Sequence, residues 1–122
     1  MAKQAPDATI DASLDYIAGS NVQVACSGEP ANYAGLAAVA LADVAMAGGD
    51  FTKANGDVSG RKVTMAAKNT VSVDSSGTAT HIALADTVSS TLRYVTTCTS
   101  QALTAGNTVN FPAWKIEIAD PT

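Results

Sequence analysis

The side chain best suited to acid–base or metal chemistry is the single histidine, His81. It lies between Ala79 and Ala83 in an alternating stretch, on one face of an expected strand. A metal site needs several converging ligands, and a catalytic histidine needs a nucleophile or an orienting partner. The spacing marks no such partner, so we expect His81 to be an exposed or interface residue.

The two thiols, Cys26 and Cys98, are far apart in the sequence. They form no CxxC motif and have no metal-ligand spacing. Each continues an apolar strand face, which favours buried free thiols. A disulfide between them also remains open, because it depends on whether their two strands are neighbours.

The carboxylates and the glycine-rich stretch carry no catalytic spacing either. Glu29 and Glu117 do not form a recognisable acid/base pair. Residues 55–62 lack the spacing of a phosphate loop, and no serine occupies a GxSxG elbow. Four aspartates are separated singletons without the alternating ligands of an EF-hand, namely Asp43, Asp50, Asp57 and Asp74. We therefore expect no enzyme activity, no metal and no cofactor.

The composition indicates one folded domain spanning residues 1–122. Hydrophobic residues make up 47% of the chain and charged residues 15%, which excludes an intrinsically disordered segment. The net charge of −4 argues against a nucleic-acid partner, since binding phosphates requires clustered cations. The chain has no apolar run long enough for a transmembrane helix and no apolar core of a signal peptide near residue 1, so we expect synthesis in a reducing cytosol and no membrane partner.

Small side chains dominate the apolar fraction. Alanine supplies 24 residues, whereas aromatic residues make up only 5% of the chain. Small side chains bury little area each, at roughly 25 cal/mol per Å². A core built from them is thin, which favours a protein whose packing is completed by neighbouring subunits.

Residues 7–18 are predicted to form one short helix. Asp7 is the expected N-cap, and Gly19 is expected in the left-handed conformation after the last turn. Ile10, Leu14 and Ile17 form one apolar stripe, which must dock on the chain's own sheet or on a neighbouring subunit. We take these three residues as candidate interface residues.

Residues 21–118 are predicted to be β-rich, with short alternating strands and turn signals about every 8–12 residues. Residues 31–49 are ambiguous: we expect a loop or short helix to about Val39 and then a strand to Met46. The turn at residues 105–107 is of a hairpin type. The expected core residues share inward positions on these strands and are Val22, Val24, Cys26, Val63, Met65, Ile82, Leu84, Leu92, Tyr94, Trp114, Ile116 and Ile118.

The inward face changes phase near the end of the chain. Val109 and Phe111 occupy odd positions, whereas Trp114 and Ile116 occupy even ones. Side chains alternate with a period of two, so the strand must break between them. Pro112 lies at this crossover and cannot donate a ladder hydrogen bond, which makes it a candidate edge and interface residue.

These patterns predict a mainly β, antiparallel sandwich or small barrel with one short N-terminal helix. Several stretches together resemble a group of small virion proteins of tailed bacteriophages and prophages. The matching residues are 14–17 (LDYI), 24–30 (VACSGEP), 41–46 (LADVAM) with 50–51 (DF), 58–65 (VSGRKVTM), 76–84 (SGTATHIAL), 92–98 (LRYVTTC), 103–109 (LTAGNTV) and 112–121 (PAWKIEIADP).

The resemblance implies a structural part of a phage particle, made in the bacterial cytoplasm and located in the virion. The expected function is capsid decoration, with multivalent binding to the major capsid protein and a homo-oligomeric or lattice-bound state. The alternatives are a collar, tail or fibre-associated adaptor and a monomeric ligand-binding module. The low aromatic content argues against the last, because sugar-binding sites commonly stack on Trp or Tyr.

Overall fold

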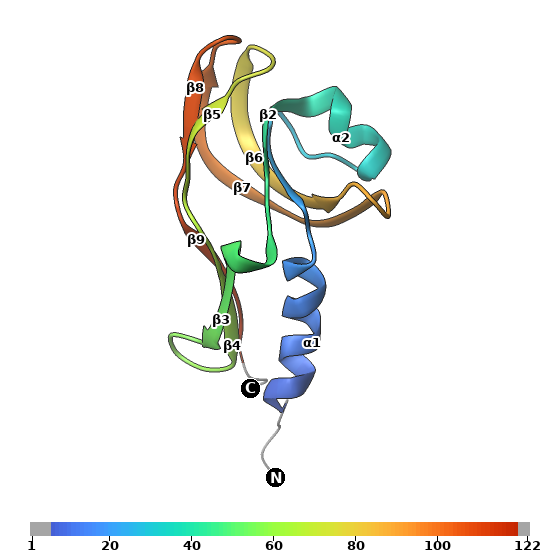
Figure 1. The fold of residues 1–122 in the computed structure, drawn as a ribbon, viewed down its shortest axis with the longest axis vertical. Coiled ribbons are helices and arrows are strands. Elements are labelled where there is room, and N and C mark those ends of the chain that lie inside the picture. The colour runs from blue at the N-terminus through green and yellow to red at the C-terminus, as the bar shows by residue number, and fades with distance from the viewer. Residues whose placement is uncertain (1–5, 120–122) are drawn as a thin grey trace.

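The computed structural model describes residues 6–119 (Figure 1). It is an antiparallel β sandwich with two helices, and all its paired strands run antiparallel. The predicted mainly β fold is confirmed, and the sheets do not close into a barrel.

The first layer is a four-stranded sheet in the order β2-β1-β6-β7. Its strands are β2 (Ala40–Ala45), β1 (Val22–Cys26), β6 (Gly77–Asp86) and β7 (Thr91–Leu103). At one edge, β2 meets the second layer through a single bridge between Ala42 and Val73. The other edge strand, β7, pairs only with β6.

The second layer is a long ribbon in two halves. Its lower half is the sheet of β3 (Phe51–Asn55), β4 (Arg61–Met65) and β9 (Trp114–Ile118), and its upper half pairs β5 (Lys68–Ser72) with β8 (Thr108–Phe111). Met65 lies opposite Trp114 and Lys68 lies opposite Phe111, and the register of the upper half then shifts between Lys68 and Val71. A short 3₁₀ turn, η1 (Gly48–Asp50), leads from β2 into β3.

The predicted phase change at Pro112 is present. Pro112 and Ala113 separate β8 from β9, at the point where the chain leaves one half of the ribbon and enters the other. Val109 and Phe111 face a cluster under the four-stranded sheet, whereas Ile116 faces a second cluster under the N-terminal helix. The two halves therefore pack on different elements.

The N-terminal helix α1 (Asp7–Ala18) docks on the chain itself. Ile10, Leu14 and Ile17 are all buried, and they share a cluster with Val63 and Met65 of β4. Figure 1 shows α1 beside β3 and β4, below the four-stranded sheet. The candidate interface role of these three residues is therefore wrong, because the stripe is buried inside one subunit, against β4 and against Leu84 of the four-stranded sheet.

The ends of α1 also differ from the prediction. Pro6 occupies the N-cap position and Asp7 is the first helical residue, with no side-chain cap. Gly19 has φ −78° rather than a left-handed conformation. A Cβ at Gly19 would lie 2.4 Å from Nη1 of Arg93, so a larger residue there would require the Arg93 side chain to move.

The ambiguous region resolves into helix α2 (Tyr33–Val39) followed by β2. The side chain of Asn32 caps α2 by accepting from the Gly35 amide, 2.8 Å away. Leu36 packs on Val24, Cys26 and their neighbours on the outer face of the four-stranded sheet. The central strands β1 and β6 are therefore covered on both faces, which the alternating pattern did not predict.

Six of the twelve predicted core residues are buried, and the other six are half-buried. The buried members are Val24, Cys26, Val63, Met65, Leu84 and Ile116, and the half-buried members are Val22, Ile82, Leu92, Tyr94, Trp114 and Ile118. Leu92 and Tyr94 were expected on one face, but they join clusters on opposite faces of the sheet. The reason is an irregularity in pairing between Leu84 and Ala85 that shifts the register of β7.

Candidate functional site

The connection between β7 and β8 is the most unusual feature of the fold. Strands joined by a turn this short normally pair with each other as a hairpin. The expected turn is present, with Gly106 at φ +89° and the Asn107 amide donating to the Thr104 carbonyl, 3.1 Å away. The hairpin expectation is nevertheless wrong, because β7 pairs with β6 and β8 pairs with β5.

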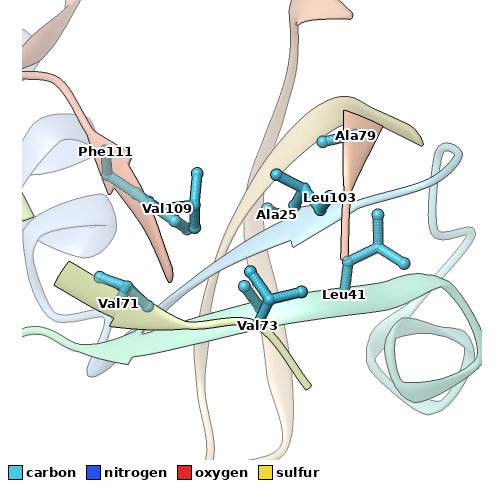
Figure 2. Close-up of a cluster of buried hydrophobic side chains, with 9 residues drawn as sticks. Ala25, Leu41, Val71, Val73, Ala79, Leu103, Val109 and Phe111 are labelled. Atoms are coloured by element: carbon cyan, nitrogen blue, oxygen red, sulfur yellow. The ribbon is translucent and has the colours of Figure 1, made fainter. Parts of the chain in front are cut away.

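A cleft of about 230 Å³ lies between these diverging strands. Its floor comes from β1 and β6, and its two walls come from β7 and from the β8–β9 segment around Pro112. The lining residues are Gln23, Ala25, Ala79, Ile82, Cys98, Thr99, Gln101, Leu103, Val109, Asn110, Phe111, Pro112 and Trp114. Figure 2 shows Ala25, Ala79 and Leu103 across from Val109 and Phe111. Of the candidate interface residues, Pro112 is thus exposed at the rim of this cleft.

Gln23 supplies the buried polar group of the cleft. Gln23 is only 1% exposed, and its Oε1 accepts a hydrogen bond from Nε1 of Trp114, 2.6 Å away. Its Nε2 lies 3.9 Å from the sulfur of Met46, a weak acceptor. The Trp114 ring is tilted against Tyr94, with centroids 6.1 Å apart. This network fixes the base of the cleft, because each group depends on the next for its position.

The sequence reasoning missed Gln23. The alternation of Val22, Val24 and Cys26 placed Gln23 on the solvent face of a half-buried strand, but the second layer covers that face. The useful signal was the helix at residues 33–39: once it covers the Val24 face, the opposite face must form the sandwich core.

The two cysteines are free thiols in different surroundings. Cys26 is buried under α2, and burial, with a smaller contribution from Cys98, raises its pKa to about 11. Cys98 is half-buried in the cleft wall, and burial raises its pKa as well. The structure contains no disulfide between them, which answers the question left open by the sequence.

The segment that forms most of the cleft wall, residues 94–114, is uncharged. Residues 94–114 contain no Asp, Glu, Lys, Arg or His. The charged pairs lie outside this segment: Arg61 contacts Asp11 at 2.9 Å, Lys68 contacts Asp50 at 2.9 Å, and Arg93 contacts Asp86 at 3.1 Å. The cleft and its rim are therefore an uncharged strip on a molecule with net charge −4.

The other residues considered for chemistry each contact neighbouring side chains. His81 is half-buried, with its Nδ1 2.9 Å from the Thr80 hydroxyl. Asp57 holds the β3–β4 loop by pairing with Lys62 and Lys115. Asp43, treated as isolated in the sequence, lies next to Asp74, and its pKa is raised by burial and by the Asp74 charge.

Within residues 6–119, no three His, Cys, Asp or Glu side chains are grouped so that they could hold a metal ion. No helix in the same range combines the length and the apolar character needed to cross a membrane. Comparison of the chain with known protein families, with curated proteins and with solved structures finds no match.

Proposed function

We propose that this chain is a structural component of a tailed-phage virion and acts as a capsid decoration protein. Its partners are the major capsid protein and other copies of itself. Two lines support this proposal: the resemblance that runs over nearly the whole sequence, and a surface suited to binding protein rather than to a reaction.

The observation that carries the proposal is the uncharged cleft between the unpaired edges of β7 and β8. An unpaired edge presents backbone donors and acceptors, which are a template for another polypeptide strand. Soluble proteins usually protect such edges with charge. An uncharged edge beside an apolar cleft is therefore suited to a surface that is covered in an assembly.

The modest size of this surface supports the decoration role. A cleft of about 230 Å³ offers a modest contact area for each copy. Repeated weak contacts on a lattice sum to strong attachment, because each bound copy raises the effective concentration of the next contact. The same volume lies below the roughly 300–1,000 Å³ that is usual for small-molecule sites, which disfavours a monomeric ligand-binding module.

The alternative is a collar, tail or fibre-associated adaptor. It uses the same kind of contact but at one place on the particle. Quantitative mass spectrometry of purified particles distinguishes the two roles, because decoration requires many copies distributed over the shell and an adaptor requires few. Absence of the chain from the particles would contradict both.

A further inference from the structure

We propose that the free edge of β7, at residues 99–103, pairs with the same edge of a second copy of this chain. The pairing is antiparallel about a two-fold axis, extends the four-stranded sheet across the dimer and covers the mouth of the cleft. It deepens the self-association that forms part of the proposed function, but its physical basis does not depend on a phage particle.

The first argument is the lack of protection on this edge. Thr99, Ser100, Gln101 and Ala102 are exposed, and none of them is charged or a proline. Three other edges carry protection: β3 carries Lys53, β9 carries Lys115 and Glu117, and β2 is bridged to Val73. Lysines, prolines and covering segments are the usual means of preventing edge pairing.

The geometry of β7 sets the limits of the pairing. The pairing with β6 is irregular between Ala79 and His81, so Cys98 and Thr99 come to line the cleft. Regular pairing resumes at Gln101 and continues to Leu103. The free stretch of residues 99–103 has the usual length of a strand, about five residues.

The second argument is electrostatic. Two copies with net charge −4 repel each other unless they meet where neither presents charge. The uncharged strip of residues 94–114 is such a place. A second copy therefore fits this edge better than a charged partner does.

The third argument is closure. A two-fold pairing uses the same patch on both subunits, so it consumes both free β7 edges and leaves none to propagate. Alternate side chains of the added strand point toward the cleft, above Ala25 and Ile82. The pairing thus removes exposed apolar surface and satisfies backbone groups in one step.

The test is sedimentation equilibrium of the full-length chain, with the oligomeric state measured up to about 100 μM. We expect a dimer for the wild type. Thr99→Lys and Gln101→Lys place like charges opposite each other across the axis, so each should weaken dimerisation about tenfold or more. Ala45→Lys, also exposed but on the opposite edge strand, is the matched control and should dimerise like the wild type.

A cysteine scan locates the contact. In a Cys98→Ser background, single cysteines at Thr99, Ser100 and Gln101 bring two thiols near the axis, where opposite residues lie within disulfide range. We expect oxidation to cross-link at least one of them and not Ala45→Cys. A monomeric wild type, or a dimer that cross-links only through Ala45→Cys, overturns the proposal. A dimer with this contact that fails to bind phage shells would contradict the proposed function and leave this inference standing.

Discussion

Trp114 donates its indole N–H to the Oε1 of Gln23, 2.6 Å away, and so joins the last strand of the chain to the first. The two residues are 91 positions apart. The bond links the layers of the sandwich at the base of the cleft, where a lost donor leaves a buried amide oxygen unsatisfied.

Trp114→Phe should therefore destabilise the fold by about 1–3 kcal/mol, the usual cost of an unpaired buried polar group. Trp114→Ala should cost about 3–5 kcal/mol, since it also removes the aromatic packing against Tyr94. Chemical denaturation followed by circular dichroism measures both changes, because the only tryptophan is lost in each variant. A double variant that combines Trp114→Phe with Gln23→Met should lose less stability than the sum of the losses in the two single variants. Additive losses would show that the bond makes no contribution.

Leu14→Ala should destabilise the chain by about 2–5 kcal/mol without altering its oligomeric state. Leu14 is 0% exposed and packs on the β3–β4–β9 sheet, so its loss leaves a cavity inside one subunit. Ser13→Ala, at an exposed position on the same helix, is the control and should be near neutral. Wild-type stability together with weaker self-association would restore the interface role that the structure rejects.

Alanine substitutions at Gly60 and Gly106 should distinguish the cost of backbone strain from the cost of steric overlap. Both have positive φ, but a Cβ at Gly60 would lie 1.9 Å from the Ile118 carbonyl oxygen, whereas nothing lies within 4 Å at Gly106. Gly106→Ala should cost about 1 kcal/mol from strain alone, and Gly60→Ala should cost clearly more. Thermal unfolding of the two variants measures the difference. Equal losses would mean that the β3–β4 loop moves away from Ile118 without penalty.

Asp50 should make the fold less stable in acid. Its pKa lies below the ordinary value near 3.8, because its carboxylate accepts hydrogen bonds from Lys68 and from the Ala47 amide. A lowered folded-state pKa contributes stability above the unfolded pKa, and this contribution is lost as the pH falls through the folded pKa. Asp50→Asn should thus lower the urea midpoint at pH 7 and have little effect at a pH below both pKa values.

Asp43→Asn is the matched control for Asp50→Asn, because the pKa of Asp43 is shifted in the opposite direction. Burial and Asp74 raise the pKa of Asp43, so its ionised form is disfavoured in the folded state. Removing that charge should leave the stability at pH 7 unchanged or increase it. A loss at pH 7 equal to that of Asp50→Asn would contradict the assignment of the two environments.

The thiols should differ in reactivity. At pH 8, Cys26 should resist a thiol reagent in the folded protein, because it is buried and its pKa is about 11. Cys98 should react slowly, and both should react on unfolding. Reaction of Cys26 at the rate of Cys98 in the folded chain would show that α2 opens readily from the sheet.

The sequence predicted the local features that depend on neighbouring residues. The helix at residues 7–18 and the break at Pro112 follow from periodicity and turn chemistry. The strand face of Val63 and Met65 was also predicted, because β4 has only one covered face with that spacing.

The features that depend on distant elements could not be predicted in this way. Gln23 is buried because the second layer, built from residues 51–72 and 108–118, covers its strand, and no local pattern reports that cover. The turn at residues 105–107 indicated a hairpin, yet its strands join different layers. The pairing of β7 with β6 and of β8 with β5 is a long-range choice, so the cleft was not visible from the turn itself.

The central claim is that this chain works by binding to a particle. Its most direct test is co-sedimentation of the purified chain with phage shells that lack it, across a series of chain concentrations. We predict saturable binding of many copies per shell, reduced when Thr99→Lys or Gln101→Lys replaces the wild type. A chain that stays in the supernatant at every concentration, while remaining folded, would contradict the account.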